Sequence, residues 1–143
     1  MVSQRVDKNL SERAQPRRRA LNVIVADDER DTVLTLTAVL RDEGHHVRGV
    51  YRGDDVLRAV EADRPDAVIL DIEMPGKSGF AIAQELRHAY GDDTPMLIAI
   101  SGKWTGQTDE MLGRLVGFKH YCLKPFEPQK LLELLEPLAG GAG

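Results

Sequence analysis

Polar side chains whose types suit the transfer of an anionic group follow four of the short apolar segments in this sequence. Asp27 and Asp28 follow the first such segment, Asp71 the third, Ser101 the fourth and Lys124 the fifth. Carboxylates that lie close together repel one another, and their ionised forms need a positive counter-charge. If the chain brings these ends together, the set combines a carboxylate nucleophile, a hydroxyl donor and an ammonium group.

A hard divalent cation with oxygen ligands would supply the missing counter-charge. Mg²⁺ binds through few carboxylates and keeps several waters, so Asp28 and Asp71 could bind it directly and Asp27 through a water. Lys124 offers a point positive charge for a phosphoryl oxygen. These residues therefore predict a pocket for a dianionic phosphoryl group, with Asp71 as the in-line nucleophile and Ser101 bonded to the new phosphoryl group.

The segments that must position these groups alternate between two kinds of pattern. Apolar runs predict strands over residues 21–26, 46–50, 67–70, 96–100 and 120–123. Helical spacing predicts helices over residues 31–43, 54–63, 80–89 and 105–116, the last weakened by Gly113, and a final helix after Pro128 that buries Leu131, Leu134, Leu135 and Leu138. Strands that are apolar throughout are typical of a parallel sheet covered on both faces, so we expect an α/β, doubly wound fold. Ligands of such sheets bind beyond the carboxyl ends of the strands.

Composition and charge narrow the class of protein further. The single cysteine, Cys122, excludes an internal disulfide and a multi-cysteine metal site. No apolar run is long enough to span a bilayer and no signal peptide is evident, so we expect a soluble, cytoplasmic protein without membrane contact. The first 20 residues carry six Lys/Arg and two acids, while the net charge of the whole chain is −4. We predict a flexible basic leader over residues 1–20, one acidic domain over 21–139 that does not bind nucleic acid by itself, and a disordered tail over 140–143.

The chain resembles the receiver domain of response regulators, the flavodoxin-like family that includes the bacterial chemotaxis regulator. The resemblance covers about residues 21–138 and rests on a set of motifs rather than on any one of them. These are Asp27-Asp28, Asp71 followed by Met74-Pro75-Gly76 and Gly79, Ser101-Gly102, and Lys124-Pro125-Phe126, all at spacings similar to those of the family. The resemblance implies a central five-stranded parallel sheet with strand order 2-1-3-4-5.

The resemblance also implies roles for individual residues. Asp71 would be the phosphoacceptor, and Asp27, Asp28, Asp71 and the backbone carbonyl of Glu73 would hold Mg²⁺. Ser101 would be the switch hydroxyl, Tyr121 the switch aromatic, and Lys124 the lysine of the pattern, with a Lys124–Pro125 peptide that is often cis. Glu73 and Lys103 depart from the common pattern. Because they line the path of an attacking water, we expect them to tune dephosphorylation.

The implied function is a switch in a two-component or phosphorelay system rather than a separate enzyme. The domain would take a phosphoryl group from a phosphohistidine of a sensor histidine kinase or histidine phosphotransfer protein, and catalyse only its own phosphorylation and dephosphorylation. Output would pass to an unidentified protein through the fourth helix, fifth strand and fifth helix, from a monomer or a phosphorylation-dependent dimer. The chain could be a stand-alone regulator or part of a larger one.

Interpretations that give several of these residues, and some others, a structural or solvated role instead of a functional one stay open at this point. Asp27 and Asp28 could cap the following helix, and Glu29 reads as a solvated acid of its first turn. The four histidines read as structural or solvated, Trp104 as a loop residue that could contact a partner, and Arg17–Arg19 as solvated residues or as a contact for DNA or an acidic partner.

Two other functional classes use related features. A phosphatase of the haloacid dehalogenase type also uses an aspartate nucleophile with Mg²⁺, but it places that residue after its first strand and adds a cap domain. A flavin mononucleotide carrier needs a hydroxyl- and glycine-rich loop after strand one. Here three consecutive acids occupy that place.

Overall fold

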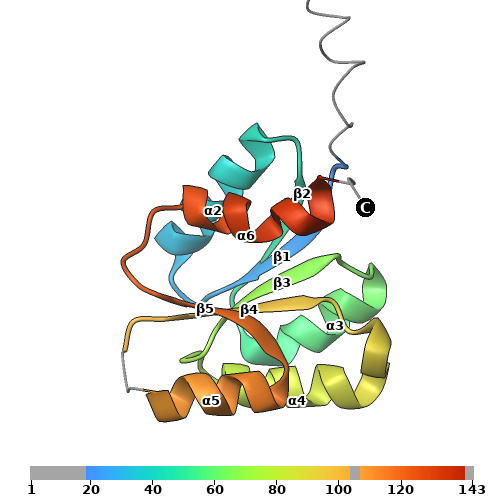
Figure 1. Ribbon diagram of the computed structural model, residues 1–143, viewed down its shortest axis with the longest axis vertical. Helices are drawn as coiled ribbons and strands as arrows, with labels where there is room; N and C mark the ends of the chain where they lie inside the picture. The colour runs from blue at the N-terminus through green and yellow to red at the C-terminus, as the bar shows by residue number, and fades with distance from the viewer. Residues whose placement is uncertain (1–18, 104–106, 141–143) are drawn as a thin grey trace, which may run out of the picture.

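The computed structural model describes residues 19–103 and 107–140, which form a five-stranded parallel sheet between two layers of helices (Figure 1). The strands are β1 (Asn22–Ala26), β2 (His46–Val50), β3 (Ala67–Asp71), β4 (Met96–Ser101) and β5 (Phe118–Leu123). Their order across the sheet is β2-β1-β3-β4-β5. The predicted doubly wound sheet and its strand order are therefore confirmed.

Helices cover both faces of this sheet. Helices α2 (Arg30–Asp42) and α6 (Gln129–Ala139) pack on one face, and α3 (Val56–Ala62), α4 (Gly79–Tyr90) and α5 (Gln107–Val116) pack on the other (Figure 1). Short 3₁₀ helices η1 (Gly53–Asp55) and η2 (Gly91–Asp93) precede α3 and follow α4.

The strand β3 shows why its sequence is apolar throughout. All five of its residues are buried. Val68 and Leu70 belong to the core on the α3–α4 side, whereas Ala67 and Ile69 belong to the core on the α2–α6 side. Side chains alternate across a strand, so a central strand covered on both faces buries every position.

Two elements differ from the sequence prediction in the second half of the fold. Gly113 does not interrupt α5, because the helix continues through it to Val116. A glycine inside a helix lowers stability by only about 1 kcal/mol relative to alanine. Gly113 packs next to the rings of Phe80 and Phe118. Strand β5 begins at Phe118, two residues before the predicted start, because the buried Phe118 ring packs edge-on against Phe80.

Other differences concern the ends and packing of helices. The predicted helix over residues 54–63 is divided into η1 and α3. Of the four leucines predicted to be buried by the last helix, Leu131 and Leu135 are fully buried and Leu134 and Leu138 are half-buried. Gly44 ends α2 with a φ of 94°, a left-handed conformation that glycine adopts easily.

The first described residues already contact the domain. The backbone N–H of Arg19 donates to the carbonyl of Ala139 at 2.7 Å, and its guanidinium bonds to Asp66 at 3.0 Å. Residues 1–18 of the predicted leader, residues 141–143 of the predicted tail and Trp104 lie outside the described residues.

The structure also describes His45, which the sequence suggested to be structural or solvated. His45 is buried, and its Nδ1 accepts a hydrogen bond from the Leu21 N–H at 3.0 Å, so this histidine is structural. Burial raises the pKa of the Cys122 thiol. Among the described helices, none has the length and apolar character that crossing a membrane requires.

Candidate functional site

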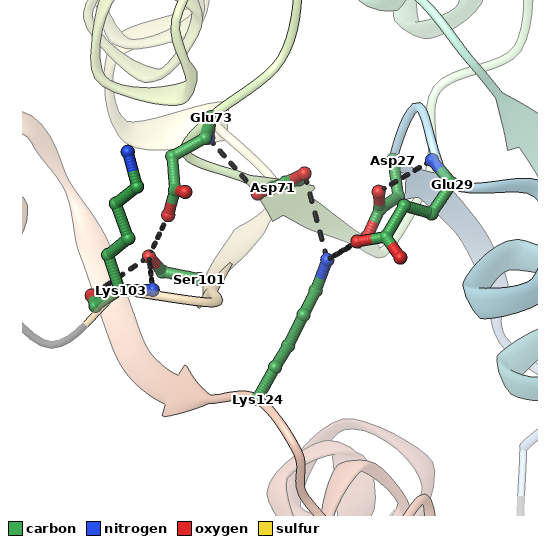
Figure 2. A network of polar contacts seen from close by, with 7 residues as sticks. All are labelled: Asp27, Glu29, Asp71, Glu73, Ser101, Lys103 and Lys124. Carbon is green, nitrogen blue, oxygen red and sulfur yellow. Dashed lines mark hydrogen bonds and ion pairs between the residues drawn. The ribbon is translucent and has the colours of Figure 1, made fainter.

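Parallel pairing of the strands brings the predicted residues to one edge of the sheet. In the sheet register, Asp71 lies opposite Ile100, and Ser101 opposite Leu123. Asp27 and Asp28 directly follow β1, Asp71 and Ser101 are the last residues of β3 and β4, and Lys124 directly follows β5. Because all five strands run in the same direction, these side chains meet at their carboxyl ends, and Figure 2 shows Asp27, Asp71, Ser101 and Lys124 there.

Three carboxylates form the acidic part of this site. Asp27, Asp28 and Asp71 each place one carboxylate oxygen within 4.8 Å of the others. Asp27 and Asp71 are buried and Asp28 is exposed, so the cluster opens to solvent on one side. An all-oxygen donor set of this kind suits a hard divalent cation.

Asp27 is held in a turn rather than in a helix cap. Its Oδ1 accepts the N–H of Glu29 at 2.9 Å. Glu29 is itself the N-cap residue of α2, and no side chain caps that helix. The capping interpretation of the acidic pair therefore does not account for Asp27.

Lys124 is the cation of the site. Its Nζ lies 2.6 Å from Asp27 Oδ2 and 3.7 Å from Asp71 Oδ2 (Figure 2). Its backbone N–H donates to the Ser101 carbonyl at 2.7 Å, and the Lys124–Pro125 peptide bond is cis. One ammonium group thus faces two buried carboxylates, which leaves the cluster with excess negative charge.

Burial and the neighbouring charges together shift the pKa of Asp71. Burial raises the pKa of Asp71 to about 7, and the nearby Asp27 carboxylate also raises it. The Glu73 N–H, which donates to Asp71 Oδ1 at 3.0 Å, and Lys124 act in the opposite direction. For Lys124, burial lowers the pKa, but the hydrogen bond to Asp27 and the charges of Asp71 and Asp27 outweigh it, so the pKa is raised.

Ser101 lies on the other side of Asp71 and is engaged by Glu73. The Ser101 hydroxyl is buried and donates to Glu73 Oε1. Its oxygen also accepts the Lys103 N–H at 3.1 Å (Figure 2). The sequence interpretation assigned Glu73 a backbone role and a place on the water path. It missed this side-chain contact.

Comparison with known proteins places this arrangement in a family. The family model of the response regulator receiver domain matches residues 23–136. The chain belongs to the response regulator receiver family. The expectation drawn from its motifs is therefore confirmed, and the domain is the receiver domain of a two-component response regulator.

Solved structures agree with this membership. Chemotaxis response regulator CheY4 of Vibrio cholerae is 24% identical with a TM-score of 0.76, over 84% of this chain and 99% of that one, a likeness of fold. A putative response regulator from Chloroflexus aurantiacus is 26% identical with a TM-score of 0.76, over 84% and 98% of the two chains. NtrX from Brucella abortus, in a complex with ATP, is 29% identical with a TM-score of 0.74, and the match covers 83% of this chain but 27% of NtrX.

The receiver domain also contains a contact that sequence reasoning missed on the acidic side. Glu29 Oε1 lies 3.2 Å from Lys124 Nζ, although the Glu29 side chain is largely exposed. It is therefore more than a solvated acid of the first helical turn. Its place next to the acidic pair, at the same sheet edge, was the available signal.

Tyr121 lies apart from this polar network. It is half-buried on β5 and packs against the core on the α3–α4 side, next to Gly113 of α5. The ring therefore links β5 to the helix that follows Ser101 in the chain.

Proposed function

We propose that this receiver domain accepts a phosphoryl group on Asp71 from the phosphohistidine of a sensor histidine kinase or histidine phosphotransfer protein. One observation carries the proposal: the buried Asp71 carboxylate lies 3.7 Å from Lys124 Nζ and shares with Asp27 and Asp28 a cluster of carboxylate oxygens within 4.8 Å of one another. A carboxylate beside a cation and a cation-binding donor set is the arrangement that phosphoryl transfer to an aspartate requires.

Mg²⁺ fits the acidic cluster. Three carboxylates share one ammonium group, and a bound cation would offset the burial and the Asp27 charge that raise the pKa of Asp71 to about 7. Asp28 and Asp71 would bind the ion, Asp27 would act through a water, and the Glu73 backbone carbonyl would complete the protein ligands. When bound, the cation supplies neutralisation of charge on the phosphoryl oxygens.

The other residues position and neutralise the incoming group. Lys124 approaches one phosphoryl oxygen, and the Ser101 hydroxyl donates to another. The transition state of phosphoryl transfer is loose and spreads charge over its equatorial oxygens, so fixed donors around Asp71 provide most of the catalysis. Glu73 and Lys103, on the side of Ser101, would set the rate at which water removes the phosphoryl group.

The phosphoryl state would be transmitted through Ser101 and Tyr121 to the surface formed by α5, β5 and α6. The proposed domain spans residues 21–139, acts in the cytoplasm, and turns over no separate substrate. It works either alone or within a longer chain, and the short match within NtrX is an example of the second arrangement.

A phosphorylation assay tests the proposal. Incubation with Mg²⁺ and acetyl phosphate should add the mass of one phosphoryl group to the intact protein, and Asp71→Asn should abolish the adduct because the nucleophilic oxygen is lost. Asp63→Asn, at an exposed position after α3, is the matched control and should still be phosphorylated. Steady hydrolysis of phosphate esters without an adduct would instead indicate a phosphatase.

The proposed output surface can be tested through its exposed apolar residues. Met111, Leu112 and Leu115 of α5 and Leu123 of β5 are all exposed, and Leu115 has 81% of its surface accessible. If phosphorylation drives dimerisation through this surface, beryllium trifluoride with Mg²⁺ should produce a dimer in sedimentation velocity, and Leu115→Ser should weaken it. A monomer in both states would point to output through another protein.

A further inference from the structure

The Ser101 hydroxyl is already committed to a carboxylate in this structure. Its side chain is buried at the end of β4, and it donates to Glu73 Oε1. The hydroxyl oxygen also accepts the Lys103 N–H at 3.1 Å, and the Lys103 carbonyl oxygen lies 3.1 Å from it as a second acceptor. A serine hydroxyl has one proton to donate. While that proton bonds to Glu73, it is not available to a group on Asp71.

Glu73 is also anchored to the phosphoacceptor through its backbone. Its N–H donates to Asp71 Oδ1 at 3.0 Å, while Asp71 Oδ2 faces Lys124. The same residue therefore contacts Asp71 with its main chain and Ser101 with its side chain (Figure 2). Its carboxylate has the charge sign and the acceptor oxygens of a phosphoryl group.

We propose that Glu73 is an internal competitor of the phosphoryl group, whose carboxylate holds Ser101 until a phosphoryl group on Asp71 displaces it. This inference rests on the proposed function and adds a specific regulation to it. Glu73 acts as a positioning residue through Ser101. Its competition disfavours the loaded state, in addition to any effect on the attacking water.

The size of the competition follows from the kind of bond. Hydrogen bonds to an ionised carboxylate are stronger than neutral ones. If the binding-competent arrangement is only a minor population, the apparent affinity for the ligand falls by that fraction. Freeing Ser101 should therefore tighten binding of a phosphoryl analogue by roughly tenfold.

We call this hold of Glu73 on the Ser101 hydroxyl the lock. A double-mutant cycle distinguishes the lock from simple charge repulsion between Glu73 and the phosphoryl group. The probe is beryllium trifluoride in saturating Mg²⁺, measured by isothermal titration calorimetry on the full chain. Wild type, Glu73→Ala, Ser101→Ala and the double variant form the cycle, and circular dichroism checks that each one is folded. Glu73→Ala should bind roughly tenfold tighter than wild type, but the double variant should bind like Ser101→Ala.

Each outcome of the cycle is decisive. If Glu73→Ala tightens binding of the analogue equally with and without the Ser101 hydroxyl, Glu73 acts only through its charge. If Glu73→Ala does not tighten binding at all, Glu73 does not restrain Ser101. Either result overturns the lock. Glu61→Gln removes an exposed charge from α3 and should leave the affinity unchanged. If no variant binds the analogue and none is phosphorylated, the proposed function fails together with the lock. Phosphorylation of Asp71 without an effect of Glu73 overturns the lock alone.

Discussion

Replacing Lys124 by methionine is expected to lower the free energy of unfolding of the metal-free protein by about 3 kcal/mol near neutral pH. Methionine keeps most of the apolar stem of lysine, so the change mainly removes the ammonium group. Asp27 is fully buried and loses its 2.6 Å ion pair. Removing one partner of a buried pair is costly because it leaves the other charge without compensation.

Chemical denaturation in the presence of a chelator measures this effect. The second substitution Asp27→Asn should recover most of the lost stability, since the uncompensated carboxylate is then gone. Lys119→Met, on the exposed side of β5, is the matched control and should change stability by less than about 0.5 kcal/mol. A Lys124→Met protein as stable as wild type would show that the ion pair is not what keeps Asp27 buried. In functional assays, Lys124→Met should impair switching more than metal binding.

Asp71→Asn is expected to stabilise the metal-free protein above neutral pH. The folded-state pKa of Asp71 is about 7, against an ordinary value of 3.8, so the folded protein binds the proton more tightly than the unfolded chain. The resulting contribution to stability is fully present below the unfolded pKa and is lost as the pH rises through the folded pKa. Between about pH 4 and about pH 7 the loss amounts to at most about 4 kcal/mol.

The measurement is a comparison of urea denaturation for wild type and Asp71→Asn from about pH 5 to about pH 8. With a chelator present, the difference in unfolding free energy should grow in favour of the variant as the pH rises. The asparagine oxygen can still accept the Glu73 N–H, so the variant loses the charge and keeps that bond. A constant difference across this range would contradict the raised pKa.

The same denaturation measurements in saturating Mg²⁺ are the matched condition to those with a chelator. Binding of the ion favours ionised Asp71, so saturating Mg²⁺ should flatten the pH dependence of wild type and reverse the ranking of the two proteins at high pH. Asp63→Asn should follow wild type in both buffers, because it removes a carboxylate outside the site. If Mg²⁺ stabilised Asp71→Asn as much as wild type, Asp71 would not be a ligand.

The sequence by itself determined the parallel sheet and which residues lie at the edge of the sheet that carries the site. Runs such as residues 67–70, apolar at every position, require burial on both faces, and parallel strands of this kind place their carboxyl ends together. Asp27, Asp71, Ser101 and Lys124 could therefore be assigned to one site from strand ends alone. The start of β5 could not be predicted in this way, because Phe118 extends the strand through a ring contact with Phe80, which lies far away in the chain.

Only the tertiary structure decided which partners the long side chains choose. Glu73 and Ser101 are 28 positions apart, and Glu29 and Lys124 are 95 apart. Glutamate and lysine side chains have several rotatable bonds, and ordering them costs conformational entropy. Their partners therefore depend on which charged or hydrogen-bonding groups lie nearest in three dimensions, and not on local pattern. For this reason the strand ends identified Asp71 and its neighbours, whereas the hold of Glu73 on Ser101 and of Glu29 on Lys124 emerged only when four strand ends were placed side by side.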